Sequence, residues 1–388
     1  MSQPQSIVGR TGSRAAAPYR VMIVDDSAVI RGFLIRWLEA EPDIEVVAIA
    51  SNGAHALREF DRARPELVVL DIEMPEMDGL TALPALVRRD PDVQVIMAST
   101  LTRRNADVSL KALSMGAADY IAKPESTRVV NEKEMFQRGL VEKIRALGAT
   151  RRGRDAAAGK AVARSEPAQA ITAYKRPAAQ SVKPPIALRS LKTLPVPKAI
   201  AIGASTGGPQ ALFKLFEALK GKIDLPIFVT QHMPETFTAI MAEHLNRLYD
   251  KECVEAKDGQ KVSHNGVYIA PGNWHMTIVN KGVDMFIRLN QEPPENYCRP
   301  SVEPMLRSLH TVFGANLLTV ILTGMGHDGL DACKKLAESG AVVIGQDEET
   351  SIVWGMPGAV ANAGLCNRVL PLQEIPQAIE SVIRGRLV

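Results

Sequence analysis

The chain has 388 residues, of which 46% are hydrophobic and 23% charged, and its formal net charge is +3. This length suffices for two domains with full hydrophobic cores, and the composition is typical of a globular protein. No apolar run is long enough to cross a membrane. Residues 1–18 lack the apolar centre of a signal peptide, so we expect a disordered polar tail there.

The positive charge is concentrated in one segment. Between Ala149 and Pro197 there are ten Lys and Arg residues against two acidic residues, so the rest of the chain is net negative. A folded nucleic-acid-binding domain is therefore weakly supported. The cysteines form no C-x-x-C pair, which favours inert, mostly buried thiols in a reducing cytoplasm. They are Cys253, Cys298, Cys333 and Cys366.

Residues 19–147 alternate apolar runs with helical patterns, which predicts a doubly wound parallel α/β sheet. The predicted strands are 21–24, 44–50, 67–70, 93–98 and 120–122. Polar side chains follow four of these strands: Asp25 and Asp26, then Asp71, then Ser99 and Thr100, then Lys123. Each alone could be an ordinary helix-capping residue, but the agreement of four strand ends argues against that reading.

These strand-end residues suggest phosphoryl chemistry. Three carboxylates at one edge repel one another unless a cation lies between them, and oxygen ligands suit Mg²⁺. Asp71 is the central carboxylate and the natural nucleophile toward a phosphoryl donor. Lys123 could pair with the phosphoryl group, and a hydroxyl after the fourth strand could sense it.

This part of the chain resembles the receiver domain of two-component response regulators. The matching stretches are 24–27 (VDDS), 70–79 (LDIEMPEMDG) and 122–124 (AKP). The resemblance implies phosphorylation of Asp71 by a histidine kinase, and a cis peptide bond before Pro124. It implies these further roles: Mg²⁺ ligands Asp25, Asp26, Asp71 and the Glu73 carbonyl; switch residues Ser99 and Tyr120; phosphate-pairing residue Lys123.

Residues 148–197 are rich in Ala, Arg, Lys and Pro and show no sustained periodicity. Such a segment cannot bury enough apolar surface to fold alone. We expect a basic tether, with a dedicated binding role as the alternative.

Residues 198–388 again predict an α/β domain with a largely parallel sheet. Its first strand, 199–202, leads into Gly203-Ala204-Ser205-Thr206-Gly207-Gly208-Pro209 and then a helical pattern. Ser205 should therefore sit on a tight strand-to-helix turn at the sheet edge where α/β proteins bind ligands. The spacing matches neither the dinucleotide nor the Walker A fingerprint, and a helix-capping Ser is the alternative.

Two further strand ends deliver His232 and Asp328. A hydroxyl, an imidazole and a carboxylate on one edge supply nucleophile, base and orienting group for acyl transfer. The order Ser…His…Asp differs from that of α/β-hydrolases and indicates a separate fold. His275 is the main competitor for the base, with His264 and His327 also in predicted loops. The histidines lack the ligand spacing of a zinc site.

These motifs resemble the protein-glutamate methylesterases of bacterial chemotaxis. The matching stretches are 203–209, 231–233, 270–272, 323–329 and 355–357; in 299–304, Glu303 stands where the family commonly has Asp. The resemblance implies a triad of Ser205, His232 and Asp328, with Thr206 and Met325 beside the oxyanion site. It implies phosphorylation-activated hydrolysis of glutamate γ-methyl esters on methyl-accepting chemotaxis receptors, and probable deamidation of receptor glutamines, without a cofactor for the ester chemistry.

The sequence disfavours two other classes of function. A phosphorylation-gated adaptor would bind receptors without turnover, but binding alone needs none of Ser205, His232 and Asp328. A DNA-binding response regulator would need a basic recognition helix, which the second domain lacks.

Overall fold

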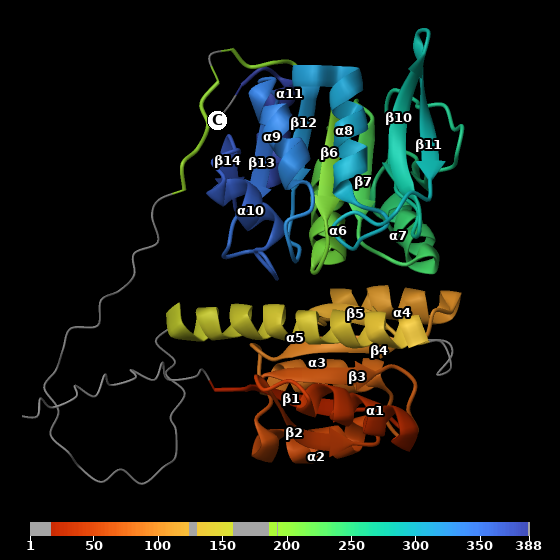
Figure 1. Ribbon diagram of the computed structural model, residues 1–388, viewed down its shortest axis with the longest axis vertical. Coiled ribbons are helices and arrows are strands. Elements are labelled where there is room, and N and C mark those ends of the chain that lie inside the picture. Colours follow the sequence, from red (N-terminus) through yellow and green to blue (C-terminus); the bar gives the residue numbers. More distant parts are fainter. Residues whose placement is uncertain (1–16, 124–129, 158–185, 192, 387–388) are drawn as a thin grey trace, which may run out of the picture.

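The computed structural model describes residues 17–123, 130–157, 186–191 and 193–386, which form two stacked α/β domains (Figure 1). The expected tail therefore lies almost wholly outside the described residues, as does Pro124. None of the described helices is long and apolar enough to cross a membrane.

The receiver-like domain has a five-stranded parallel sheet of order β2-β1-β3-β4-β5, which confirms the predicted fold class. Its strands are β1 (Tyr19–Val24), β2 (Ile44–Ala50), β3 (Leu67–Asp71), β4 (Gln94–Ser99) and β5 (Asp119–Ala122). Its helices are α1 (Ala28–Glu39), α2 (Gly53–Ala63), α3 (Gly79–Arg89), α4 (Arg103–Ser114) and α5 (Val130–Ala157). Helices α1 and α5 cover one face and α2, α3 and α4 the other, so the central strands are apolar on both sides.

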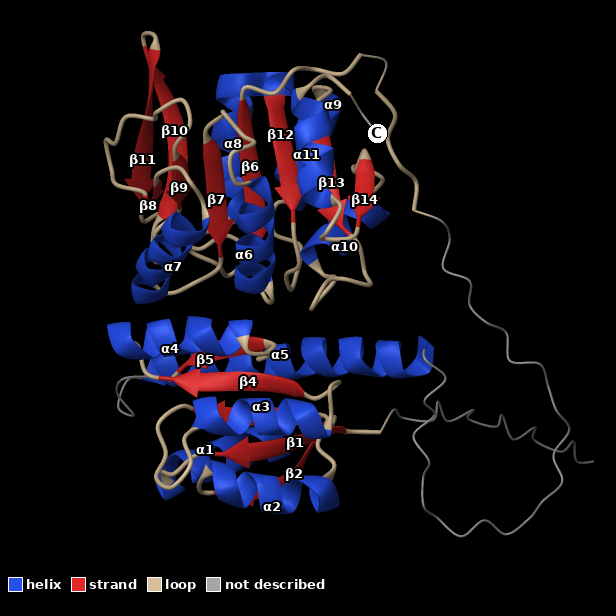
Figure 2. Ribbon diagram, turned by 180° about the vertical axis from the view of Figure 1, so that it is seen from behind, coloured by secondary structure: helices blue, strands red, loops and turns tan. Residues whose placement is uncertain are grey.

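The second domain has a seven-stranded parallel sheet of order β14-β13-β12-β6-β7-β9-β8 (Figure 2). Its strands are β6 (Ala199–Ala204), β7 (Ile227–Gln231), β8 (Cys253–Glu255), β9 (Val267–Ile269), β12 (Leu317–Ile321), β13 (Val342–Gln346) and β14 (Arg368–Leu370). Its helices are α6 (Gly208–Leu219), α7 (Glu235–Leu248), α8 (Val302–Phe313), α9 (Leu330–Glu338), α10 (Met356–Asn362) and α11 (Ile375–Ile383). An antiparallel hairpin, β10 (His275–Lys281) and β11 (Asp284–Asn290), was not anticipated from the sequence.

The expected tether begins later than the sequence indicated. Helix α5 does not end at Leu147 but continues to Ala157, because its last turns make contacts with distant acidic residues. Arg151 pairs with Asp90 at 2.7 Å, and Arg152 with Glu66 at 2.6 Å. Residues 158–185, the middle of the expected tether, lie outside the described residues.

The last part of the expected tether is bound to the second domain. Arg189 donates to the Asn367 side chain at 2.8 Å and to the carbonyl of Ala337 at 3.1 Å. The Asn367 amide in turn donates to the Arg189 carbonyl at 2.9 Å. The segment is therefore anchored at Arg189 and is not a free connection there.

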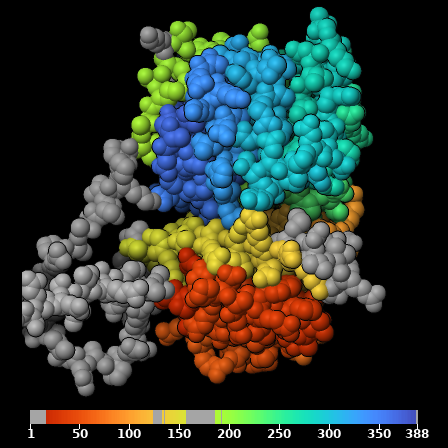
Figure 3. Space-filling view, in the orientation of Figure 1, coloured from red at the N-terminus to blue at the C-terminus, as the bar shows by residue number. Residues whose placement is uncertain are grey.

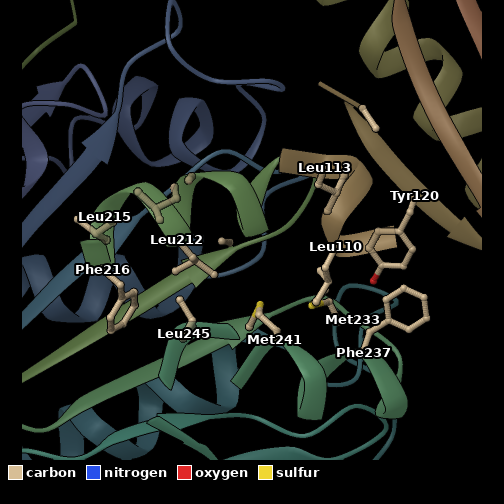
Figure 4. Packing of buried hydrophobic residues seen from close by; sticks show 14 of the residues in the cluster. Leu110, Leu113, Tyr120, Leu212, Leu215, Phe216, Met233, Phe237, Met241 and Leu245 are labelled. Carbon is tan, nitrogen blue, oxygen red and sulfur yellow. The ribbon is translucent and has the colours of Figure 1, made fainter. Parts of the chain in front are cut away.

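The two domains meet along α4, β5 and α5 on one side and α6 and α7 on the other (Figures 1 and 3). At the centre of this interface Tyr120 stacks on Phe237, with ring centroids 4.4 Å apart and planes 8° apart. Leu110 and Leu113 of α4 belong to the same buried cluster as Met233 of the second domain (Figure 4). The domains thus share apolar surface.

Polar contacts surround that apolar centre. Across α4 and α7, Asp107 lies 2.8 Å from His244, and Arg103 lies 2.5 Å from Glu243. The Gln210 amide donates to the Ala117 carbonyl at 2.5 Å. These contacts fix which face of the receiver-like domain meets the second domain.

Candidate active site

Ser205 lies where the sequence placed it, on the turn between β6 and α6. Gly207 takes a left-handed backbone conformation (φ 76°) and is the N-cap of α6, which has no side-chain cap. Ser205 therefore does not cap the helix, which removes the capping alternative. Its side chain lines a cavity instead.

His232 follows β7 and is paired with Asp328. Its Nε2 lies 2.7 Å from Asp328 Oδ2. Its other ring nitrogen, Nδ1, lies 3.3 Å from the Sγ of Cys298. Since Asp328 occupies Nε2, Nδ1 is the nitrogen left to act as a base.

Asp328 is held by neutral donors from the segment before α8. Ser301 Oγ donates to Oδ1 at 2.7 Å, the Val302 N–H donates to Oδ2 at 2.6 Å, and the Asn296 amide donates to Oδ1 at 3.0 Å. Asp328 is only 2% exposed. Burial raises the pKa of this carboxyl, but the bonds from His232, Val302 and Ser301 outweigh burial and lower the pKa to about 2.

The charge on Asp328 acts on His232. Burial lowers the pKa of this imidazole, but Cys298 and Asp328 outweigh it and raise the pKa to about 10. Both neighbours therefore favour the charged form of the imidazole. A general base must be neutral, so a role of His232 as the base requires it to lose this proton first.

Ser205 and His232 line the same cavity, of about 780 Å³, but no hydrogen bond joins their side chains among the described contacts. One of the two predicted triad contacts, Asp328 to His232, is made, whereas the Ser205 to His232 contact is replaced by Cys298 to His232. Three of the four cysteines are buried, as expected, and Cys298 is the exception, because it is half-buried and lines the cavity.

Thr206 and Met325 lie on the loops after β6 and β12, which are tied together. The Thr323 hydroxyl donates to the Thr206 carbonyl at 2.9 Å and accepts from the Val353 N–H at 3.0 Å. Within the described part of the chain, the N–H groups of Thr206 and Met325 have no protein acceptor. Two free donors beside a nucleophile suit an oxyanion.

The competing histidines are placed differently. His275 is fully buried, and its two ring nitrogens face the Pro293 carbonyl at 3.2 Å and the Ser301 N–H at 3.2 Å. His275 is thus a structural residue that holds the segment carrying Ser301. His264 and His327 are exposed.

Three residues around the pair were missed by sequence reasoning: Asn296, Cys298 and Ser301. Asn296 and Tyr297 both have left-handed backbones, φ 50° and 62°, in a turn closed by Glu295 and Cys298. The sequence offered no periodic signal there. The one hint at these residues was the segment 299–304, which includes Ser301 and resembles the family.

A second cluster lies at the carboxyl edge of the receiver-like sheet. Ligand oxygens of Asp25, Asp26 and Asp71 lie within 4.8 Å of one another. Lys123 Nζ lies 2.7 Å from both Asp25 and Asp71. Burial raises the pKa of Asp71 to about 6, although Lys123 lowers it. An all-carboxylate set at this spacing fits Mg²⁺.

The remaining predicted receiver residues lie on the same edge or next to it. Ser99 ends β4, is 1% exposed and lies 3.1 Å from the Ser109 hydroxyl. Glu73 is exposed in the loop after β3, and the role of its carbonyl stays a prediction. Tyr120 points away from the acidic cluster, into the interface.

Comparison with known proteins places the chain in a family. The family model "CheB methylesterase" matches residues 200–379, and "Response regulator receiver domain" matches residues 21–133. A protein-glutamate methylesterase/protein-glutamine glutaminase of Rhodospirillum centenum is 50% identical over 380 residues, covering 96% of each chain. One from Paramagnetospirillum magneticum is 52% identical over 366 residues, covering 94% of this chain and 96% of the relative. The chain belongs to the protein-glutamate methylesterase/protein-glutamine glutaminase family.

Solved structures match the two domains of this methylesterase-family chain separately. The Thermotoga maritima CheB methylesterase catalytic domain is 36% identical and covers 47% of this chain and 97% of its own, with a TM-score of 0.46. The response regulator domain of Thermotoga maritima CheB is 36% identical and covers 33% of this chain and 94% of its own, with a TM-score of 0.30.

The cavity of the methylesterase domain has one wall from each domain. Ser205 and His232 line it from one side, and Tyr120, Phe136 and Lys143 of the receiver domain from the other. The receiver domain thus forms part of the surroundings of Ser205 and bears on access to it.

Proposed function

We propose that this chain hydrolyses glutamate γ-methyl esters on methyl-accepting chemotaxis receptors, releases methanol, and also deamidates receptor glutamines. The observation that carries the proposal is the placement of Ser205 and an Asp328-oriented His232 on one cavity wall. The names and near full-length coverage of the relatives supply the substrate class.

The residues would share one acyl-enzyme mechanism. His232 Nδ1 takes the proton of Ser205, whose Oγ attacks the ester carbonyl, while Asp328 holds Nε2 and stabilises the imidazolium. The N–H groups of Thr206 and Met325 bind the oxyanion. His232 then protonates the departing methanol, and a water molecule, deprotonated by His232, cleaves the glutamyl-enzyme. With a glutamine substrate, ammonia leaves in place of methanol.

Regulation would follow from the receiver domain. A histidine kinase supplies the phosphoryl group to Asp71, and Lys123 pairs with it. Bound Mg²⁺, held by Asp25, Asp26, Asp71 and the Glu73 carbonyl, would neutralise phosphoryl charge. Ser99 moves toward the phosphoryl group and Tyr120 leaves Phe237. A closed state favoured a hundredfold needs about 2.7 kcal/mol of differential stabilisation to reach parity.

The test is methanol release from methylated receptor membranes, with and without a small-molecule phosphodonor, and ammonia release from receptors carrying glutamine. The full chain should be slow alone and faster with phosphodonor. Residues 186–388, which keep the Arg189 anchor, should be fast and indifferent to phosphodonor. Receptor binding without methanol release would instead indicate an adaptor, and an isolated domain no faster than the full chain would exclude inhibition by the receiver domain. We also propose that the protein is cytoplasmic.

A further inference from the structure

Gln231 stands between the two turns that carry the nucleophile and the base. It is the last residue of β7 and directly precedes His232. Its partner in the sheet register is Ala204, which directly precedes Ser205. Its side chain is 2% exposed. A group in this position can act on both turns at once.

The amide of Gln231 makes that connection. Its Nε2 donates to the Ser205 carbonyl at 2.9 Å and to the His232 carbonyl at 3.3 Å. The Ser205 carbonyl also accepts from the Gly208 N–H at 2.7 Å, so the nucleophile turn is held from two sides. One side chain therefore sets the separation of the Ser205 and His232 backbones.

Stability alone does not explain an amide here. Its Oε1 is buried and has no hydrogen-bond partner among the described residues. A buried acceptor without a partner destabilises the folded protein, whereas an apolar side chain of the same shape would avoid that loss. The unpaired Oε1 lowers the stability of the folded protein, so the contacts of Nε2 need a role other than stability.

The chain also reserves space for this amide. A Cβ atom at position 208 would lie 1.9 Å from Gln231 Oε1, 2.9 Å from its Cδ and 2.9 Å from the Ala204 Cβ. Gly207 needs glycine for its left-handed backbone, but Gly208 is not among the glycines with positive φ. Glycine at 208, on the first turn of α6 where alanine would favour the helix, is thus explained mainly by the Gln231 side chain, which makes the shortest of these contacts, and in part by Ala204.

We propose that Gln231 is a positioning residue for acyl transfer, which fixes the Ser205 turn relative to the His232 turn. The inference rests on the proposed function and deepens it. Bond-making groups must meet within a few tenths of an ångström of the productive geometry, so a small relative shift of the two turns slows the reaction without altering substrate binding.

Two substitutions test the proposal in the full chain with phosphodonor. Gln231→Met keeps the length and removes the donors, and Gln231→Glu keeps the shape but turns a carboxylate oxygen toward two carbonyls. Each should lower kcat for methanol release by about 10- to 100-fold, with KM within about twofold. The pH midpoint of the rate should not move in Gln231→Met, because this change adds no charge and the His232–Asp328 bond is intact. Gln94→Met is the matched control, since Gln94 is a buried glutamine of the receiver domain that donates to the Asp92 carbonyl.

Gly208→Ala approaches the same contact from the other side. Overlap with Oε1 should displace the amide and lower kcat as Gln231→Met does. Combining Gly208→Ala with Gln231→Ala relieves the overlap with the amide but not the 2.9 Å approach to the Ala204 Cβ, so thermal stability should recover in part while kcat stays low. Recovery of kcat in the double variant, or a Gln231→Met protein with lowered Tm and unchanged kcat, would show a purely structural role and overturn the proposal.

A fluorophosphonate probe separates this proposal from the proposed function. It reacts with a serine activated by a base and needs no receptor. If the unaltered protein releases no methanol but labels at Ser205, the substrate assignment fails while slower labelling of Gln231→Met still supports positioning. Equal labelling of both proteins refutes positioning.

Discussion

In the receiver domain the charged side chains of the acidic cluster hold one another, whereas in the methylesterase domain the carboxylate paired with His232 is also held by three neutral groups outside the proposed triad. Lys123 lies 2.7 Å from both Asp25 and Asp71, so each charge depends on the others. Asp328 is held by Ser301, Asn296 and the Val302 N–H. The first arrangement responds to an added charge, and the second keeps one geometry. Substitutions in the receiver domain should therefore change regulation, and substitutions in the methylesterase domain should change the rate of methanol release.

The sharpest test of that contrast is Ser205→Ala, which removes the proposed nucleophile and leaves the acidic cluster of the receiver domain intact. Methanol release should fall by about four orders of magnitude. Adding His232→Ala should cost little more, because the two residues act in one proton transfer. Ser263→Ala, whose hydroxyl contacts Tyr268, is the control. Losses that multiply independently would contradict a shared step.

Asp26→Asn should impair the receiver domain and leave the methylesterase site intact. Loss of one carboxylate from the acidic cluster should weaken Mg²⁺ binding by about tenfold or more and slow Asp71 phosphorylation. Basal methanol release should be unchanged. Isothermal titration with MgCl₂ gives the affinity, and Asp61→Asn, an exposed acid paired with Arg89, is the control. Phosphorylation that survives excess chelator would exclude the metal site.

Tyr120→Ala should weaken the contact between the domains, because Tyr120 belongs to the receiver domain and stacks on Phe237 of the methylesterase domain. Such a stack contributes about 0.5–1.5 kcal/mol, so basal methanol release should rise by up to about tenfold. Phe286→Ala, in the distant hairpin, should have no such effect. A basal rate that stays low would place the closing interaction elsewhere in the interface.

Cys298→Ala tests the contact between the Cys298 thiol and His232 Nδ1, the nitrogen proposed to act as the base. Burial lowers the pKa of His232, and Cys298 and Asp328 raise it to about 10. Removing the thiol should lower that pKa, so the rise of rate with pH should move to lower pH. The raised pKa stabilises the folded chain fully below pH about 6.5 and decreasingly up to pH about 10. The variant should lose less stability across that interval in urea titrations.

Arg103→Glu should give the smallest change, because it affects an exposed ion pair. Repulsion from Glu243 should raise basal methanol release by about twofold to threefold at low salt. Restoring the pair in reverse, with Glu243→Arg added, should return the rate to its original value. A double variant as fast as the single would assign the effect to something other than this pair.

Residues at the ends of parallel strands could be placed from the sequence. Asp71, Ser205, His232 and Asp328 each follow a short apolar run, and the carboxyl ends of such strands share an edge. The fold class followed from the same runs. Their periodicity is local, so no knowledge of distant contacts was needed.

The features that were missed depend on contacts between distant segments. The last turns of α5 look like a tether in composition and are helical because Arg151 and Arg152 reach Asp90 and Glu66. Cys298 contacts His232 because a turn with two left-handed residues brings it there, and no hydrophobic periodicity in the sequence predicts that turn. The hairpin of β10 and β11 had a local signal, Gly282 between two alternating segments, that was overlooked.

The cavity is walled by both domains, so the proposed function couples the two sites in both directions. On that proposal, a receptor segment that fills the space beside Ser205 would displace Tyr120 and its neighbours, as phosphorylation would. Free-energy coupling is reciprocal, so the factor by which phosphorylation improves receptor binding would also be the factor by which a bound receptor favours the phosphorylated receiver domain. The substrate would then be an effector of the switch that admits it.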